Sequence, residues 1–200
     1  AAHVGSIGSK CRVAYGSRVA YGRMAAMLAS TPTSVFVDRL RRARVAMART
    51  DVDVLLVSVG SDLPYLIGYE AMPLERLTML VVPRDGEATL VVPGLEAPRV
   101  VPREEAFTIR PWGELEDPVA LVAGLVARPA TVAIGDTMWA RFVVELLAHW
   151  STDRTRYVRA TTVMNDLRMR KDAAEVAALL AAGAAVDRIA ARLHAGEIAL

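Results

Sequence analysis

The sequence has a single cysteine, Cys11, so an internal disulfide framework is excluded. A chain without disulfides suits a reducing compartment, and we expect a cytoplasmic protein. Long hydrophobic runs are also absent. The longest uncharged apolar stretch, Val176 to Val186, is about half of the ~20 residues that span a bilayer. We therefore expect no membrane association.

The chain has only a small excess of positive charge and few aromatic residues. The formal net charge is +2, and aromatic residues make up only 6% of the chain. Nucleic-acid binding favours a concentrated basic face with interleaved aromatic side chains, and the sequence shows neither. Hydrophobic residues reach 54% of the 200 positions, which is enough for one domain with a substantial core.

Residues 1–33 differ from the rest of the chain. They contain glycine, serine and four basic residues but no acid, and the first acidic residue is Asp38. This composition predicts a disordered or artefactual leader. An Arg-rich organelle transit peptide is the alternative interpretation.

Residues 34–163 show the alternating patterns of an α/β domain. Phe36, Leu40, Ala43 and Met47 recur at helical spacing, and the apolar run over residues 52–59 predicts a strand that is covered on both faces. Asp85-Gly86 between two apolar runs predicts a hairpin. We expect a mixed, mostly parallel sheet of about six strands with helices on both faces. The predicted strands cover residues 52–59, 77–82, 88–92, 107–110, 131–135 and 157–160.

Two further helices are predicted between these strands. Asp117-Pro118 is a typical helix start, with Leu121, Val122 and Leu125 as the expected core face. Asp136 or Thr137 is expected to cap the second helix. The expected core face of that helix comprises Phe142, Val143, Leu146 and Leu147.

Residues 164–200 differ from the preceding segment because their main feature is one long predicted helix. Asp172 followed by Glu175 predicts a capping box, and a wide apolar stripe then continues for about two dozen residues. The stripe consists of Val176, Leu179, Leu180, Gly183, Val186, Ile189 and Leu193. A long helix of this kind needs a packing partner. We expect it to pack back on the first domain, to dimerise or to make the chain prone to aggregation.

The order of these segments resembles the creatinase, prolidase and Xaa-Pro aminopeptidase family, whose catalytic domain has the pita-bread fold. The matching motifs are Arg39-Leu40 to Met47, Asp53 to Val57, Tyr65-Leu66-Ile67-Gly68-Tyr69, the hairpin Leu80 to Pro93, Ile134-Gly135-Asp136, and Leu167-Arg168-x-x-Lys171-x-x-x-Glu175. The resemblance identifies residues 34–163 as the N-terminal domain, with a ribonuclease H-like fold. Residues 164–200 correspond to the junction and the first helix of a truncated catalytic domain.

The resemblance also implies a function. Such enzymes cleave short proline-containing peptides with two divalent metal ions (manganese, cobalt or zinc) held by two Asp, one His and two Glu after the junction. His3, His149 and His194 are isolated in this sequence, and no residue is assigned to catalysis or to a metal. We therefore expect this chain alone to be inactive. Its role would be dimerisation, or pairing with a catalytic domain, and substrate gating.

Five residues are candidates for that role. The resemblance places Tyr65, Tyr69, Glu70 and Arg76 where the family lines its active-site mouth, and Trp112 is a candidate interface anchor. Ordinary packing is the competing interpretation for the tyrosines and the tryptophan. Two other functions stay open: a stand-alone interaction or regulatory protein derived from such a peptidase, and a small-molecule-binding α/β domain.

Overall fold

The structure is a computed structural model that describes residues 31–150 and 155–198. Most of the predicted leader, residues 1–30 with Cys11, lies outside the described residues. The first described helix, α2 (Thr33–Thr50), begins at the end of that predicted segment.

Helix α2 buries the stripe that its spacing predicts. Phe36, Leu40, Ala43 and Met47 are all buried, because positions three or four apart fall on the same helix face. The helix ends at Asp51, whose backbone adopts the left-handed conformation with φ 54°. The chain then turns directly into the first strand.

Six strands form one mixed sheet, as predicted, in the order β4-β3-β2-β1-β5-β6. The strands are β1 (Val54–Val57), β2 (Met79–Pro83), β3 (Thr89–Pro93), β4 (Thr108–Trp112), β5 (Thr131–Ile134) and β6 (Arg156–Arg159). The pairs β1–β5, β3–β4 and β5–β6 are parallel, whereas β2 pairs antiparallel with both β1 and β3. Gly86, with φ 119°, provides the positive φ angle of the predicted hairpin turn.

Strand β1 lies inside the sheet and is buried on both faces. Leu55 and Val57 belong to one apolar core, and Val54 and Leu56 belong to the other. Alternate side chains of a strand point to opposite faces, so a strand between two helix layers must be apolar at every position. This explains why the sequence run over residues 52–59 does not alternate.

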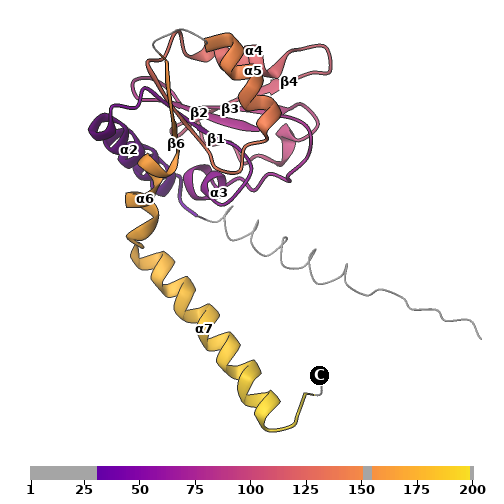
Figure 1. Cartoon of the computed structure of the whole chain (residues 1–200). Helices are drawn as coiled ribbons and strands as arrows, with labels where there is room; N and C mark the ends of the chain where they lie inside the picture. The colour runs from indigo at the N-terminus through magenta and orange to yellow at the C-terminus, as the bar shows by residue number, and fades with distance from the viewer. Residues whose placement is uncertain (1–30, 151–154, 199–200) are drawn as a thin grey trace, which may run out of the picture.

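The helices form one layer on each face of the sheet (Figure 1). Buried residues of α2, α3 (Asp62–Ile67) and α6 (Thr161–Met169) contribute to the first core. Those of α4 (Pro118–Leu125) and α5 (Ala140–Trp150) contribute to the second core. We call residues 33–169 the sheet unit.

Two details of the α4 and α5 predictions are wrong. Helix α4 buries Val119 and Val122, whereas Leu125 is exposed. Its cap is as predicted, because the Asp117 side chain accepts hydrogen bonds from two backbone N–H groups of the first turn.

Helix α5 begins at Ala140, so neither Asp136 nor Thr137 caps it directly. Asp136 forms an ion pair with Arg159, and the Thr137 hydroxyl donates to the Val59 carbonyl oxygen. Tertiary partners hold both side chains that the sequence assigned to the cap.

Both edges of the sheet discourage further strand pairing. At one edge, Pro111 in β4 lacks a backbone N–H group. At the other edge, Arg156 and Arg159 are exposed on the four-residue strand β6. Proline and charged side chains are common devices against edge-to-edge association, so neither edge is suited to a continuous intermolecular sheet.

The last helix, α7 (Ala173–His194), extends away from the sheet unit (Figure 1). None of its residues is buried. Packing back on the first domain, one of the three predicted outcomes, is therefore not what the structure shows. Among the described residues, no helix combines the length and the apolarity that crossing a membrane requires.

Candidate functional site

The Tyr65 side chain lies at the centre of the junction between the sheet unit and α7. The Arg39 guanidinium, from α2, lies 4.1 Å from the centroid of the tyrosine ring, and that of Arg168, from α6, lies 4.9 Å from it. The Tyr65 hydroxyl donates a hydrogen bond of 3.2 Å to the Leu167 carbonyl oxygen. One buried ring thereby connects α2, α3 and α6.

Both arginines also hold the backbone of α3 and the turn before it. Arg39 donates to the Tyr65 carbonyl oxygen at 2.9 Å, and Arg168 donates to the Ser61 carbonyl oxygen at 2.8 Å. Arg168 also lies 3.6 Å from the Asp62 carboxylate. Cation–π contacts contribute about 0.5–2 kcal/mol each, so the two arginines fix α3 between α2 and the end of α6.

The start of α7 is attached to the same cluster. The Asp172 carboxylate accepts the Glu175 backbone N–H at 2.8 Å, and the Glu175 carboxylate accepts the Asp172 N–H at 3.0 Å, which confirms the predicted capping box. The second guanidinium nitrogen of Arg39 contacts Asp172 at 3.1 Å. The hydrogen bond from Glu175 N–H, supported by Arg39, lowers the pKa of Asp172. Arg39 therefore links the root of α7 to α2 and to Tyr65.

Tyr69 is held in place after Gly68, which ends α3 with φ 74°. Its ring is buried, and its hydroxyl donates a hydrogen bond of 3.2 Å to the buried Glu96 carboxylate. Burial and the adjacent Glu96 charge raise the pKa of Tyr69 to about 12. Tyr69 is thus a fixed anchor at the start of the following loop.

The loop over residues 70–76 presents side chains to solvent. Met72 and Leu74 are exposed, Glu70 is half-buried, and Arg76 forms an ion pair with Glu114 at 2.6 Å. This loop, between the Tyr69 anchor and β2, is the part of the predicted gating set that another molecule can reach.

Trp112 lies at the end of β4 rather than beside Tyr65. Its ring packs partly buried against the second core, and its indole N–H donates to the Leu77 carbonyl oxygen at 2.9 Å. Because Leu77 directly follows Arg76, Trp112 supports the end of the loop. The structure therefore distributes the five predicted residues between a junction (Tyr65) and a loop with its supports (Tyr69, Glu70, Arg76 and Trp112).

A ligand crevice between β1 and β5 is filled. The helices that follow these two parallel strands cover opposite faces, and open α/β sheets commonly bind ligands at such a point. Here a Cβ atom on Gly60 would lie 2.5 Å from the Thr137 hydroxyl oxygen, so the two loops are in direct contact. The crevice between β1 and β5 is therefore closed at this point.

The described residues do not fit the two-metal centre that the resemblance implies. Among them, no group of three or more His, Cys, Asp and Glu side chains is arranged to hold a metal ion. Two adjacent cations need several anionic oxygen donors around them. No chemical step through a metal can be assigned to this part of the chain.

Arg39 and Arg168 are the junction residues that the sequence patterns did not assign to a role. They lie 26 and 103 positions from Tyr65, and no local periodicity brings them together. Their only sequence signal was membership of the two motifs Arg39-Leu40 and Leu167-Arg168.

Comparisons with known proteins agree with this architecture. The profile of the creatinase/prolidase N-terminal domain matches residues 39–170. A probable dipeptidase PepE from Mycobacterium bovis is 36% identical over 163 residues, which are 80% of this chain and 43% of that protein. The crystal structure of dipeptidase PepE from Mycobacterium ulcerans superposes with a TM-score of 0.72 at 39% identity, covering 81% of this chain and 44% of that one.

A creatinase/prolidase N-terminal domain solved on its own shares the fold. The creatinase/prolidase N-terminal domain of an X-Pro dipeptidase from Streptococcus pyogenes has a TM-score of 0.55 at 19% identity. The match covers 65% of this chain and 98% of that one. The chain spans less than half the length of the curated dipeptidases that it matches. The profile match covers more than half of the chain, which therefore belongs to the creatinase/prolidase family and contains its N-terminal domain.

Proposed function

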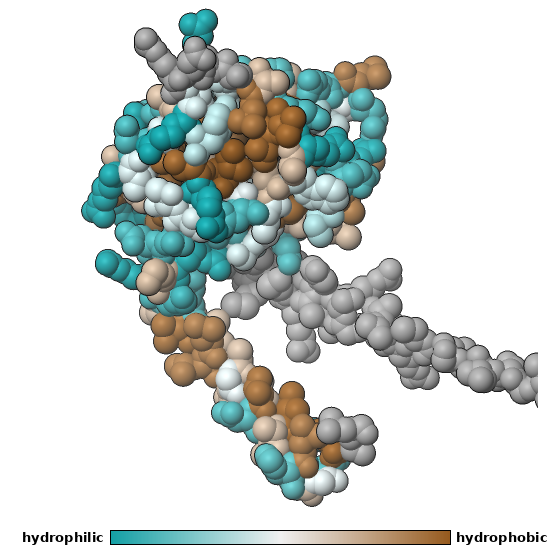
Figure 2. Space-filling view, viewed as in Figure 1, coloured by the Kyte–Doolittle hydropathy of each residue, from teal (hydrophilic) through white to brown (hydrophobic). Residues whose placement is uncertain are grey.

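We propose that residues 34–163 form the non-catalytic N-terminal domain of an Xaa-Pro dipeptidase or aminopeptidase-like metallopeptidase. Residues 164–200 then form the junction and the first helix of the catalytic domain. The observation that carries this role is α7, whose apolar stripe is exposed immediately after the matched region (Figure 2). Each large apolar side chain that is left in water forgoes about 1.5–3 kcal/mol of burial.

The junction at Tyr65 gives this role a physical basis. Arg39 contacts the α7 cap, and Arg168 closes the other face of the Tyr65 ring, so the root of α7 is attached to the sheet unit by several bonds. A catalytic domain that docks on α7 would be oriented by these contacts. We assign Tyr65 to positioning this helix.

Substrate gating is assigned to the loop over residues 70–76. Exposed Met72 and Leu74 offer apolar contacts, and Glu70 and Arg76 offer charges that can select the termini of a short peptide. Tyr69 and Trp112 hold the two ends of the loop through Glu96 and Leu77. The substrates are short proline-containing peptides.

Dimerisation, or pairing with a catalytic domain, is assigned to α7 and this loop. Pro111 at one sheet edge and Arg156 and Arg159 at the other disfavour pairing through strands. We assign the divalent metal pair (manganese, cobalt or zinc) to a catalytic portion that follows the matched region. The single cysteine supports a cytoplasmic location.

A chimaera tests this role. Residues 34–194, which include α7, replace the corresponding segment of the Mycobacterium ulcerans dipeptidase, and Xaa-Pro dipeptide hydrolysis is measured with added Mn²⁺. We expect the chimaera to hydrolyse the dipeptides and the 200-residue chain alone to show no turnover. A folded chimaera without activity, or Mn²⁺-dependent turnover by the chain alone, would contradict the proposal.

Variants of the chimaera separate the gating loop from the junction. Arg76→Gln should raise KM with little change in kcat, because the loop contacts substrate without entering the chemistry. Arg84→Gln, which removes an ion pair with Asp53 at a distance from the loop, is the matched control. A similar change in KM in Arg76→Gln and Arg84→Gln would contradict the gating role of the loop.

The alternative is a stand-alone interaction or regulatory protein. The same exposed stripe of α7 favours it, because a helix whose apolar face is left uncovered by the described residues can bind a separate partner. Activity of the chimaera would favour the peptidase role. Tight binding of the chain to an intact relative, without activity in the chimaera, would favour the alternative.

A further inference from the structure

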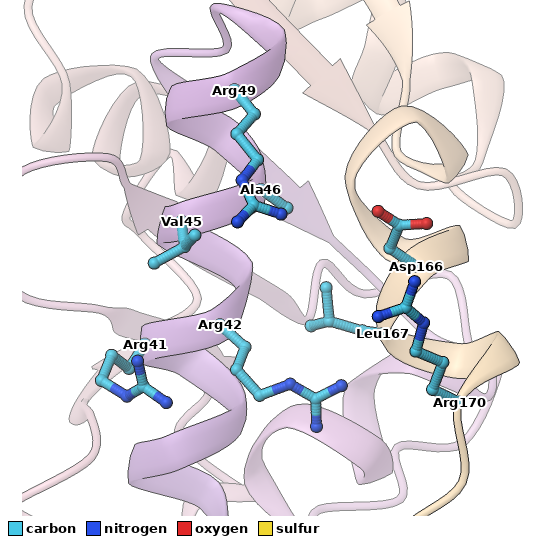
Figure 3. A pocket seen from close by; sticks show the side chains of 8 residues that line it. All are labelled: Arg41, Arg42, Val45, Ala46, Arg49, Asp166, Leu167 and Arg170. Atoms are coloured by element: carbon cyan, nitrogen blue, oxygen red, sulfur yellow. The ribbon is translucent and has the colours of Figure 1, made fainter.

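A small hollow lies between α2 and α6, on the outer side of the first helix layer (Figure 3). Its volume is about 180 Å³, which equals the liquid volume of about six water molecules. The lining residues are Arg41, Arg42, Val45, Ala46, Arg49, Asp166, Leu167 and Arg170. Four guanidinium groups and one carboxylate therefore surround a space with apolar walls.

One of the four arginines is already neutralised. Arg41 donates to the Asp38 carboxylate at 2.6 Å on the surface of α2. Arg42, Arg49 and Arg170 form no ion pair within residues 31–150 and 155–198. Other described arginines, such as Arg99, Arg128 and Arg156, also form no ion pair. The trio differs from them because its three members line one hollow.

The three unpaired groups come from opposite sides of the hollow. Arg42 and Arg49 are seven positions apart on α2, which places them on one face two turns apart. Figure 3 shows the Arg42 side chain extending from α2 toward α6, with Arg170 on the opposite side beside Asp166. Basic residues favour the carboxyl ends of helices, which accounts for Arg49 and Arg170 but not for Arg42 in the middle of α2.

We propose that this hollow binds a small phosphate-bearing anion with at least two negative charges, such as a pyrophosphate group. Guanidinium groups match phosphate oxygens in a planar, two-bonded geometry, and three of them can neutralise a multivalent anion. Val45, Ala46 and Leu167 form the apolar part of the lining. The Asp166 carboxylate repels a bound anion, and so lowers the affinity of the site for pyrophosphate.

The position of the hollow gives binding a structural consequence. A bound anion would bridge α2 to the end of α6, and α7 begins three residues after Arg170. Bridging would stiffen the junction around Tyr65 without touching the loop over residues 70–76. This site is independent of the peptidase role.

Calorimetric titration of the 200-residue chain with sodium pyrophosphate tests the site. We expect a Kd of about 1 mM or tighter at low salt, with weaker binding of sulfate and weaker binding in high salt. Arg42→Gln combined with Arg49→Gln should weaken pyrophosphate binding at least about tenfold, or 1.4 kcal/mol. Arg156→Gln combined with Arg188→Gln removes the same net charge elsewhere and should change it less than about twofold.

Asp166→Asn supplies a readout with the opposite sign. Removal of the opposing carboxylate should tighten pyrophosphate binding several-fold, whereas a merely structural role would not. Thermal unfolding without ligand should show that both arginine double variants remain folded. Three results would each overturn the site. The first is equal pyrophosphate binding by the two double variants, and the second is weaker binding by Asp166→Asn. The third is no binding heat from the unsubstituted chain at a pyrophosphate concentration about ten times the expected Kd.

Discussion

Helices α2 and α7 carry the same sequence signal and have opposite surroundings. Phe36, Leu40, Ala43 and Met47 of α2 are at most 1% exposed, whereas Leu179, Leu180 and Val186 of α7 are 60% to 70% exposed. Periodic apolar spacing determines which face of a helix is to be covered. It does not say which part of the protein covers that face.

This difference in burial between α2 and α7 also marks where the sheet unit ends. Helix α2 lies across one face of a sheet within its own chain, so its stripe is covered locally. Among residues 31–150 and 155–198, the ion pairs between the sheet unit and α7 lie at the root of the helix, from Arg39 to Asp172 and Glu175. The rest of its apolar face is available to another domain or another chain.

The largest difference in the free energy of unfolding is expected between two matched leucine-to-alanine substitutions, one in α2 and one in α7. Leu40→Ala should lower the free energy of unfolding by about 2–5 kcal/mol, because Leu40 is buried in the first core. Leu180→Ala should change it by less than about 0.5 kcal/mol, because Leu180 is exposed and alanine is a good helix former. Urea unfolding followed by tryptophan fluorescence reports on the sheet unit, where all three tryptophans lie. Equal losses of unfolding free energy in the two variants would contradict the proposed difference between α2 and α7.

Tyr69→Phe should have the next largest effect. The change leaves the buried Glu96 carboxylate without its tyrosine donor, at an expected cost of about 1–3 kcal/mol. Because folding raises the Tyr69 pKa to about 12, its contribution is complete below pH 10 and is lost as pH rises toward 12. Ultraviolet titration should show a late phenolate step that Tyr69→Phe removes. Persistence of that step in Tyr69→Phe would assign it to another tyrosine.

Asp172 variants should act mainly on the first turn of α7, with a smaller effect through the ion pair with Arg39. Asp172→Ala removes the cap and should cost about 1 kcal/mol of local helix stability, whereas Asp172→Asn keeps a cap and should cost less. Because folding lowers the Asp172 pKa, the contribution is present above the ordinary value and is lost as pH falls through the lowered one. Hydrogen exchange of the first turn of α7 measures this effect. A matching loss in the fluorescence-detected stability of the sheet unit would show that the two regions are not separate.

Much of the sheet unit was predictable because its local signals are strong. The continuous apolar run at β1 predicted burial on both faces, and Asp85-Gly86 predicted the hairpin of β2 and β3. The buried face of α4 was not predictable, because its sequence PVALVAGL is apolar at nearly every position and periodicity selects no face.

The junction could be predicted only in part. Asp172 and Glu175 are three residues apart, so their capping box is a local property of the sequence. The stacking of Arg39 and Arg168 on Tyr65 depends on three helices meeting, and no short-range pattern contains that information.

Hydrogen exchange of α7, compared with α2, tests most directly whether the α7 stripe awaits a partner. In the 200-residue chain at low concentration, we expect α2 amides to be protected nearly to the global limit and α7 amides to exchange quickly. In the chimaera with the dipeptidase, α7 should become as protected as α2. Strong protection of α7 in the monomeric 200-residue chain would contradict the account.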